Sequence, residues 1–567
     1  MSNMNILRID KDLTGINLRP EQTECIDAIF DHMKTNDSKF YLLDLPTGVG
    51  KSILALSFMV EYLRRVNPNA NFDLITESKL LQKQYADEFK SVSSLSGKNN
   101  YVCKTYKDSS CAEGVEFSKI LSTKCEGCPY TAAKVKYMGN NIGLTNFHMY
   151  ITLLMAGMAR DANVLIVDES HELETVFSDF ITITISKFVL SSFMMESSQI
   201  DAILDKLLHI SNIDEYIDFH KKVLTPVLVT HNDSLNKRLI NNKDAHDYDA
   251  QLHEAFDFGT DNKADKEQLR VIRSLNNIEQ FIKRFDKLID EYNKNNNNFV
   301  LEKEVERVEG EVKKKVKLTI QPVWVHDYFN KTIWDKYDKV ILMSGTILNK
   351  SIFCYTNGID PKDTFYYRIK SPFEIKNRPI YYIPCGKFTY KEKEESFKNA
   401  LPKLKKVLAK YKAHKGIIHT VTFEMQDWLL KSVPSDRYLS HTSDIDSKKL
   451  ALYRHYNENN PSILVSPSMG TGIDLKNERA RFQVLLKIPY PSLASLKNKK
   501  RLETNREWYA WITVAKIVQY YGRAVRSNDD FAHFFIFDSS LSELLRYSSE
   551  IFPEWVLDAI KFIGNEE

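Results

Sequence analysis

The sequence predicts an α/β fold in which two parallel-sheet parts are separated by a mostly helical segment. Short apolar strand candidates alternate with helix candidates between residues 40 and 168. The alternation lapses from residue 173 to about residue 321 and returns between residues 340 and 537. Strands that alternate with helices in this way are typical of parallel sheets built from βαβ units.

The bulk composition is ordinary for a soluble globular protein of several domains. The 567 residues are 43% hydrophobic and 27% charged, enough for about three or four domains. The net charge of +3 is too small to argue for nucleic-acid binding by itself. The start, MSNMNILRIDKD, lacks the basic and apolar regions of a secretory signal, and the apolar stretch Met149 to Ala159 is too short to span a bilayer. We therefore expect a cytoplasmic protein with no membrane contact.

The clearest local pattern is an apolar run, Tyr41-Leu42-Leu43, that leads into Pro-Thr-Gly-Val-Gly-Lys-Ser and then into a helix candidate over residues 53–63. Strand, glycine-rich loop and helix N-terminus together cradle phosphate groups. The residues expected around the phosphates are Thr47, Gly48, Val49, Gly50, Lys51 and Ser52. Lys51 would reach the β- and γ-phosphates and Ser52 would hold Mg²⁺. Leu45 stands where the strict pattern has a glycine, and a strand–helix turn that binds no nucleotide is the alternative.

Polar residues flank this loop on both sides. A helix that opens at Leu18-Arg19-Pro20 places Gln22 where its amide could read an adenine edge. After the strand candidate over residues 72–76, Ser78, Lys79 and Gln82 suit a nucleic-acid backbone. A solvated surface is an equally good reading of these three residues.

Four of the seven cysteines cluster as Cys103-x7-Cys111-x13-Cys125-x2-Cys128, followed by a proline. This clustering favours a metal site over disulfides in a large cytosolic chain. A [4Fe–4S] cluster is the first interpretation, because the Cys-Pro ending resembles ferredoxin runs. Tetrahedral zinc and free thiols are the alternatives.

A second strand candidate, residues 163–167, delivers Asp168-Glu169-Ser170-His171. Adjacent carboxylates are costly in a core, so they are expected at the strand's end, facing solvent or a ligand. Asp168 can hold the magnesium of a nucleotide and Glu169 can orient an attacking water, while His171 can report the state of the nucleotide.

The middle of the chain reads as a mostly helical insertion. Helical stripes of apolar residues occur around residues 200–208 and 269–292, and alternating apolar residues from Val312 to Ile320 suggest a β-hairpin. The insertion serves either as a spacer or as a clamp on a strand.

The second strand series carries three further motifs. Residues 340–343 lead to Ser344-Gly345-Thr346, and strand candidates follow at 416–420, 463–466, 484–488 and 533–537. Gln519, Arg523 and Arg526 recur at i, i+4 and i+7, which predicts one helical face. Two arginines together suit the developing charge of a triphosphate, with surface salt bridges as the alternative.

Taken in order, these motifs resemble those of superfamily 2 helicases of the XPD/DinG type over nearly the whole chain. Residues 46–52 resemble motif I and 168–171 resemble motif II, with Ser170 for the usual Ala. Residues 344–346, 469–474 and 519–526 resemble motifs III, V and VI.

The resemblance implies an α/β protein with two RecA-like domains, ATP between them, and iron–sulfur and helical Arch insertions in the first. The expected domains are helicase domain 1 (1–100, 139–174 and 321–375), the iron–sulfur domain (101–138), the Arch (175–320) and helicase domain 2 (376–567). The short Cys103–Cys111 interval departs from the family and leaves the ligand geometry open.

The resemblance also assigns roles to residues. Lys51, Asp168, Glu169, Arg523 and Arg526 would be catalytic, with Ser52 and Asp168 on Mg²⁺. The ATP site would add the side chains and backbone of Arg19, Gln22, Gly472, Asp474 and Gln519. Contacts to DNA or between domains would come from Ser78, Lys79, Gln82, His171, Ser344, Thr346 and Thr422.

The function implied is an ATP-driven helicase that moves 5′→3′ on single-stranded DNA and opens forked or tailed duplexes, acting as a monomer. Its cofactors would be ATP, Mg²⁺ and a [4Fe–4S] cluster, with Zn²⁺ as the alternative, and the Arch could bind partner proteins. The alternatives are a translocase that strips proteins or RNA from DNA without unwinding, and a scaffold subunit whose ATPase only switches conformation.

Overall fold

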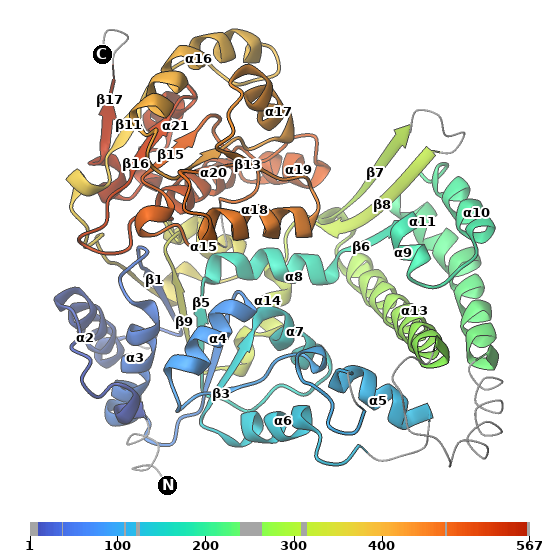
Figure 1. Ribbon diagram of the computed structural model, residues 1–567. Coiled ribbons are helices and arrows are strands. Elements are labelled where there is room, and N and C mark those ends of the chain that lie inside the picture. Colours follow the sequence, from blue (N-terminus) through green and yellow to red (C-terminus); the bar gives the residue numbers. More distant parts are fainter. Residues whose placement is uncertain are drawn as a thin grey trace.

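The computed structural model describes residues 9–36, 38–106, 109–120, 125–238, 263–307, 314–470 and 473–563. Within these ranges the strands form two seven-stranded sheets and one three-stranded sheet (Figure 1). Every pair in the two large sheets is parallel, and the small sheet is antiparallel. The predicted α/β class with two parallel sheets is therefore confirmed.

The first sheet has the strand order β10-β1-β9-β5-β2-β4-β3. Its strands are β1 (Phe40–Asp44), β2 (Phe72–Thr76), β3 (Ser93–Ser94), β4 (Ile142–Asn146), β5 (Val164–Asp168), β9 (Lys339–Ser344) and β10 (Thr364–Arg368). Strands β1, β2, β4 and β5 are buried along their whole length, as is usual where helices cover both faces of a parallel sheet. Because the strands are parallel, their carboxyl ends lie along one edge, which is where such sheets bind ligands.

Helices cover this first sheet and connect its strands. They are α2 (Pro20–Thr35), α3 (Lys51–Arg65), α4 (Lys79–Glu88), α6 (Pro129–Gly139), α7 (Phe147–Met155), α8 (Leu173–Ile181), α14 (His326–Thr332) and α15 (Lys350–Thr356). Helix α3 begins where the glycine-rich loop ends, with Gly50 as its N-cap residue in the left-handed conformation. The loop therefore presents its backbone at a helix N-terminus, as the sequence predicts.

Between β5 and β9 the chain leaves the first sheet to form the insertion. The insertion contains α9 (Lys187–Ser191), α10 (Ser197–Leu207), α11 (Ile213–Phe219), a π-helical turn (His220–Leu224), helical residues 225–238, and α13 (Lys263–Lys294). Its small sheet has the order β6-β8-β7, with β6 (Ile183–Ser186), β7 (Phe299–Arg307) and β8 (Lys314–Pro322). The expected hairpin is thus present as β7 and β8, although Val312 lies outside the described residues.

The insertion touches the cysteine-containing segment. Helix α5 (Cys111–Ile120) lies near α13, and the guanidinium of Arg273 on α13 forms an ion pair with Glu113 on α5 (Figure 1). These two insertions thus meet each other beside the first sheet. No helix in the described part of the chain is both long enough and apolar enough to cross a membrane.

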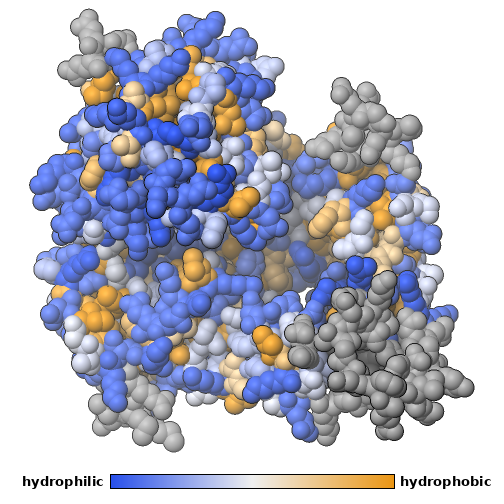
Figure 2. Space-filling view, in the orientation of Figure 1, coloured by the Kyte–Doolittle hydropathy of each residue, from blue (hydrophilic) through white to orange (hydrophobic). Residues whose placement is uncertain are grey.

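The second sheet has the strand order β13-β14-β12-β15-β16-β11-β17. Its strands are β11 (Ile380–Tyr382), β12 (Gly416–His419), β13 (Tyr438–Ser440), β14 (Ile463–Ser466), β15 (Phe482–Leu485), β16 (His533–Ile536) and β17 (Ile560–Phe562). Its helices are α16 (Lys393–Lys410), α17 (Phe423–Ser432), α18 (Ile445–Asn457), α19 (Leu496–Thr504), α20 (Arg506–Tyr521), α21 (Leu541–Tyr547) and α22 (Glu554–Leu557). Figure 2 shows that the visible face over both large sheets is mostly hydrophilic.

One prediction about this second unit is wrong. Helix α20 ends at Tyr521 with Gly522 as its C-cap, so Arg523 and Arg526 do not share a helical face with Gln519. At the end of the helix, the carbonyl of Gly522 accepts a hydrogen bond from the Thr47 hydroxyl of the first unit at 3.0 Å. The two arginines therefore lie in the loop that follows the helix.

Helix α19 joins the second unit to the first through a buried ion pair. Arg501 on α19 is 5% exposed and pairs with the carboxylate of Glu174 on α8, which is 6% exposed. The Arg501 Nε–H also donates to the carbonyl of Val323 at 2.6 Å. Its guanidinium lies 4.6 Å from the ring centre of Trp324 and 5.1 Å from that of Trp508. This one side chain thus connects three segments that are far apart in the sequence.

Replacing Arg501 by Ala should destabilise the protein strongly, because it leaves the carboxylate of Glu174 buried without its partner. Breaking a buried pair by removing one side typically costs about 3–5 kcal/mol. Urea unfolding followed by tryptophan fluorescence should therefore show a large shift to lower denaturant.

Two controls sharpen this measurement. The exposed Arg506, at the start of α20, provides an Arg→Ala control that should change the unfolding midpoint little. The double variant Glu174→Gln with Arg501→Met should recover much of the loss, since it removes the unpaired charge. A midpoint for R501A equal to that of the Arg506 control would contradict the assignment.

Candidate functional site

The glycine-rich loop is held in shape by glycines in the left-handed conformation and by residues from two other segments. Gly48 and Gly50 both have φ of +85°, which a residue with a side chain adopts only with strain. A Cβ at Gly48 would collide with the ring of Phe373, from the segment that enters the second unit. A Cβ at Gly50 would lie 2.8 Å from the amide nitrogen of Gln22. Both glycines are therefore required by conformation and by close packing.

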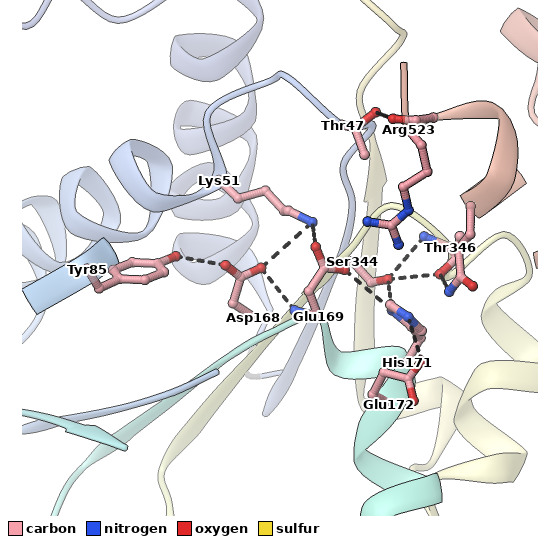
Figure 3. Close-up of polar contacts among 12 residues, drawn as sticks. Thr47, Lys51, Tyr85, Asp168, Glu169, His171, Glu172, Ser344, Thr346 and Arg523 are labelled. Atoms are coloured by element: carbon pink, nitrogen blue, oxygen red, sulfur yellow. Dashed lines mark hydrogen bonds and ion pairs between the residues drawn. The ribbon is translucent and has the colours of Figure 1, made fainter. Parts of the chain in front are cut away.

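Lys51, the first residue of α3, points toward the end of β5 (Figure 3). Its ammonium forms an ion pair with the carboxylate of Glu169 and lies 3.8 Å from Oδ1 of Asp168. Burial lowers the pKa of Lys51, but the charges of Glu169 and Asp168 outweigh this and raise it above the usual value. The lysine is thus a buried, firmly protonated cation beside two carboxylates.

The two carboxylates differ in their environment. Burial raises the pKa of Asp168, and the charge of Lys51 only partly offsets it. For Glu169, burial is outweighed by the charges of Lys51 and His171 and by the hydrogen bond from Lys51, so its pKa falls to about 2. Glu169 also has φ of +54°, an uncommon conformation for a residue with a side chain that is often found at functional sites. Glu169 is therefore an ionised acceptor held in a strained backbone.

The second unit supplies cations to the same place. In the loop after α20, Arg523 donates from Nε to the carbonyl of Gly470 at 3.1 Å and from Nη1 to that of Ile473 at 3.4 Å. The charge of Glu169 interacts with Arg523 and opposes the lowering of its pKa by burial. Arg526 lies 3.6 Å from Oδ1 of Asp474. Predicted residues from both units are thus brought together, with Gly472 lying outside the described residues.

A chain of side-chain contacts runs from β5 through β9 to the second unit (Figure 3). Nδ1 of His171 is 2.8 Å from the hydroxyl of Ser344, and that hydroxyl is 3.2 Å from Oγ1 of Thr346. The amide of Gln519 on α20 donates to Oγ1 of Thr346 at 3.5 Å. Nε2 of His171 lies 3.3 Å from a carboxylate oxygen of Glu172. The predicted coupling residues His171, Ser344 and Thr346 are thus in contact, and Gln519, predicted for the ATP site, joins them.

The structure corrects the expectation that Gln22 faces an adenine. Its amide nitrogen donates to the carbonyls of Val49 and Gly50 at 2.7 and 3.3 Å, and its oxygen accepts from the backbone N–H of Arg19 at 2.8 Å. Gln22 is only 2% exposed. Arg19 likewise donates to the carbonyl of Gly48 at 2.8 Å. Both residues hold the glycine-rich loop, and the two N–H groups of the Gln22 amide are directed to the carbonyls of that loop.

A second correction concerns the residues expected at a nucleic-acid backbone. Gln82 is 2% exposed, because its amide donates to Ser94 and to the carbonyl of Leu95, at 2.9 Å each, and accepts from Asn146. Buried and fully bonded, Gln82 does not reach a ligand. Ser78 caps α4, and Lys79 at the helix start donates to the side chain of Asn100 at 3.0 Å.

Thr422 lies apart from these residues, in the second unit. It is the N-cap of α17 and accepts from the backbone N–H of Met425 at 3.2 Å. A cavity of about 170 Å³ beside it is also lined by Tyr390, Lys393 and Lys487. Glu424 also lines this hollow and forms an ion pair with Lys393, so Thr422 lies at an aromatic hollow of mixed charge.

Cys111, Cys128 and the partly buried Cys125 lie in a small core with Tyr130 and Tyr137. The sulfurs of Cys111 and Cys128 are 3.8 Å apart, and Cys103 and Cys125 interact electrostatically with this pair. Among the residues that the structure describes, however, no group of three or more His, Cys, Asp or Glu side chains is arranged to hold a metal ion. Thiols are the ligands that soft metals prefer, but the described side chains are not arranged as a metal site.

Some residues of the site carry no sequence signal that could have identified them. Tyr85 on α4 donates to Oδ2 of Asp168 at 2.9 Å, and Tyr456 on α18 donates to the carbonyl of Asp474 at 2.9 Å. Glu172 and Phe373 are further examples. A tyrosine six residues after a candidate helix start is indistinguishable in sequence from one that only fills the core.

Two family models match parts of the chain. The model described as the type III restriction enzyme, res subunit, matches residues 15–190. The model described as the helicase C-terminal domain matches residues 403–558. The matched stretches contain, in order, the glycine-rich loop with Asp168, and the loop with Arg523. No curated protein matches the chain.

The fold resembles several solved structures along their whole length. An XPD helicase structure is 17% identical, with a TM-score of 0.61, and the match covers 97% of this chain and 100% of that one. An apo XPD structure is 14% identical, with a TM-score of 0.59 and coverages of 95% and 100%. Xpd4 of S. tokodaii is 13% identical, with a TM-score of 0.53 and coverages of 96% and 100%. These likenesses show a shared fold.

The two parallel sheets and the order of the two matched models along the chain are both consistent with this shared fold. The chain thus shares its fold with the XPD helicase structures, and it matches a restriction-enzyme res-subunit model over residues 15–190 and a helicase C-terminal domain model over residues 403–558.

Proposed function

We propose that the protein is an ATP-dependent DNA helicase that moves 5′→3′ along single-stranded DNA. The observation that carries the ATPase part is the buried meeting of Lys51, Asp168 and Glu169 from one unit with Arg523 from the other. The preference for DNA and the direction of movement are carried over from the family resemblance.

The residues present fit a magnesium–nucleotide complex. Ser52 and Asp168 offer the hydroxyl and carboxylate oxygens that Mg²⁺ prefers, and a cavity of about 540 Å³ is lined by Ser52 beside Tyr85. Bound there, the ion would neutralise phosphate charge and help orient the γ-phosphate. Gly48, Val49 and Gly50 supply the backbone that cradles the phosphates, and Lys51 adds a positive charge.

Binding of the triphosphate would redirect Lys51. In the structure its ammonium neutralises two carboxylates, and a γ-phosphate would compete with them for it. Glu169, released from this ion pair, could then orient the attacking water. Arg523 and Arg526 would stabilise the charge that develops on the transferred group.

The contacts between the units explain how hydrolysis could move them. The Thr47–Gly522 hydrogen bond and the close approach of Gly48 to Phe373 place the phosphate loop directly against the second unit. The path from His171 through Ser344 and Thr346 to Gln519 is a second connection. Losing the γ-phosphate would weaken the arginine contacts and let the units part, so that the grip on the strand alternates.

We further propose that Cys103, Cys111, Cys125 and Cys128 are the ligands of a [4Fe–4S] cluster, as in the family that the sequence resembles. Support comes from the thiol chemistry and the proximity of the four residues. Zinc stays the alternative, because 3.8 Å is close to the spacing of two thiolates that each stand about 2.3 Å from one tetrahedral zinc ion. No step of the ATPase cycle above depends on this group.

Replacing Arg523 by Ala should abolish unwinding and slow DNA-stimulated ATP hydrolysis about 10³–10⁵-fold, because arginines that reach the transferred phosphate typically contribute this much. ATP hydrolysis with single-stranded DNA, together with strand displacement on duplexes bearing a 5′ or a 3′ tail, measures both effects. The wild type should unwind only the duplex that bears a 5′ tail.

The exposed Arg546 on α21 supplies a matched Arg→Ala control in the same unit, expected to behave as the wild type. Wild-type hydrolysis by the Arg523 variant would refute the split site. Hydrolysis with protein removal but no displacement would favour the stripping translocase. Hydrolysis without displacement or movement on either tail would favour the scaffold.

Replacing His171 by Gln should remove a pH dependence of stability above about pH 6.5. Burial lowers the pKa of His171, but the hydrogen bond with Glu172 and the charge of Glu169 outweigh it and raise the pKa above 6.5. The folded state therefore binds this proton more tightly than the unfolded state. The stability gained is complete below the unfolded pKa and is lost as pH rises through the folded one.

Urea unfolding of wild type and H171Q between about pH 6 and 8 tests this, since the difference in unfolding free energy should shrink as pH rises. The exposed His148 on α7, replaced by Gln, is the control and should leave the wild-type profile unchanged. A difference that is constant or grows with pH would contradict the proposed protonation.

Replacing Cys111 by Ser should eliminate a broad visible absorption band that anaerobically purified wild-type protein shows if the cluster is present. The same preparation, analysed for iron and zinc, separates the candidates. Cys385, buried in the second unit, gives a Cys→Ser control that should keep both band and metal. A colourless wild type with one zinc per chain would support the zinc site in place of the cluster. A metal-free protein would contradict both assignments.

A further inference from the structure

Tyr85 makes a buried hydrogen bond to the acid of the candidate metal site. It lies in the second half of α4, is 1% exposed, and donates from its hydroxyl to Oδ2 of Asp168 at 2.9 Å (Figure 3). Hydrogen bonds to a charged acceptor are shorter and roughly twice as strong as those between neutral groups. The phenol is thus a substantial contact of this carboxylate.

The bond completes the anchoring of Asp168. Oδ1 accepts from the backbone N–H of Glu169 at 2.9 Å and faces Lys51 at 3.8 Å. With Oδ2 held by Tyr85, the carboxylate is fixed at both oxygens. The terminal torsion of an aspartate is otherwise broad, so the orientation of Asp168 depends on these partners.

Tyr85 is itself rigidly held. Its ring packs against Phe89, at 6.1 Å between centres, and one turn before it Gln82 ties α4 to Ser94, Leu95 and Asn146. Tyr85 and Ser52 line the same cavity of about 540 Å³. The phenol therefore contacts Asp168 directly and shares a cavity with Ser52, the two residues that would hold Mg²⁺.

We propose that Tyr85 is a positioning residue that sets the orientation of Asp168 for the magnesium of bound nucleotide. This rests on the proposed function, since it assumes that Asp168 is a metal ligand. Partners that orient a metal ligand typically change metal affinity or activity by about 10–100-fold when removed. The bond also links α4, whose first turn carries Lys79, to the metal end of the site.

The test is Tyr85→Phe, which removes one oxygen and keeps the ring. Binding of a fluorescent, non-hydrolysable ATP analogue is titrated with Mg²⁺, and ATP hydrolysis is titrated in parallel. The Mg²⁺ midpoint of both should rise about 10–100-fold, with hydrolysis recovering at saturating Mg²⁺. Mn²⁺, which binds oxygen and nitrogen sites at least as tightly, should reduce the defect.

Tyr337→Phe is a matched control. Its hydroxyl donates to Oδ2 of the buried Asp73 at 2.7 Å, so it removes an equally short Tyr–Asp bond that belongs to the same sheet but involves none of the site residues. This variant should lose thermal stability without any shift in the Mg²⁺ midpoint. An equal shift in both variants would mean that the effect is general and would overturn the proposal.

A double-mutant cycle with Asp168→Asn supplies an independent measure. If Tyr85 acts through Asp168, Tyr85→Phe should add nothing to the Mg²⁺ midpoint of the Asp168→Asn protein. An undiminished effect in that background, or a Tyr85→Phe midpoint equal to that of the wild type, would overturn the proposal. Failure of the wild type to hydrolyse ATP would instead refute the proposed function. The effect of Tyr85→Phe on the Mg²⁺ midpoint could still be measured by the binding titration, which does not require hydrolysis.

Discussion

The buried charges at the carboxyl edge of the first sheet impose the strongest constraint on this molecule. An ammonium and two carboxylates lie together at the end of β5, and each would be costly to bury alone. Lys51 can neutralise Asp168 and Glu169 only because α3 begins immediately after the loop and because β1 and β5 run parallel with β9 between them. The strained backbone at Glu169 and the phenol of Tyr85 serve the same arrangement.

The second unit is attached to the first in two physically different ways. At the glycine-rich loop the contact includes one hydroxyl–carbonyl bond and the close approach of Gly48 to the ring of Phe373, neither of which involves a charged group. At α19 the contact is the buried pair of Arg501 and Glu174, and separating it would uncover two charges. Glu174 follows motif II by only three residues. A movement of the second unit is therefore easier as a rotation about α19 than as a separation there.

The sequence was most informative where a residue's role requires a particular chemical type in a fixed place. Lys51 and Asp168 could be singled out because a glycine-rich turn and a buried strand lead to these charges. Arg523 rested on the family resemblance, since the helical spacing with Gln519 is not what the structure has. The edge strands β10, β13 and β17 could not, since partly exposed strands lack a continuous apolar run. The helical spacing of Gln519, Arg523 and Arg526 wrongly extended α20 past Gly522, because spacing alone does not reveal the hydrogen bond between Thr47 and Gly522 at the helix end.

The roles of amides and phenols are hard to predict from sequence, because their hydrogen-bond partners depend on the tertiary structure. Gln22 and Gln82 were expected to meet ligands, yet both amides satisfy backbone groups of loops that helix packing alone would leave unpaired. Tyr85 shows the converse, since a residue type typical of cores places its one polar atom on Asp168. In each case the decisive quantity is whether a buried polar atom has a partner, and that is settled only when the strands and helices are assembled.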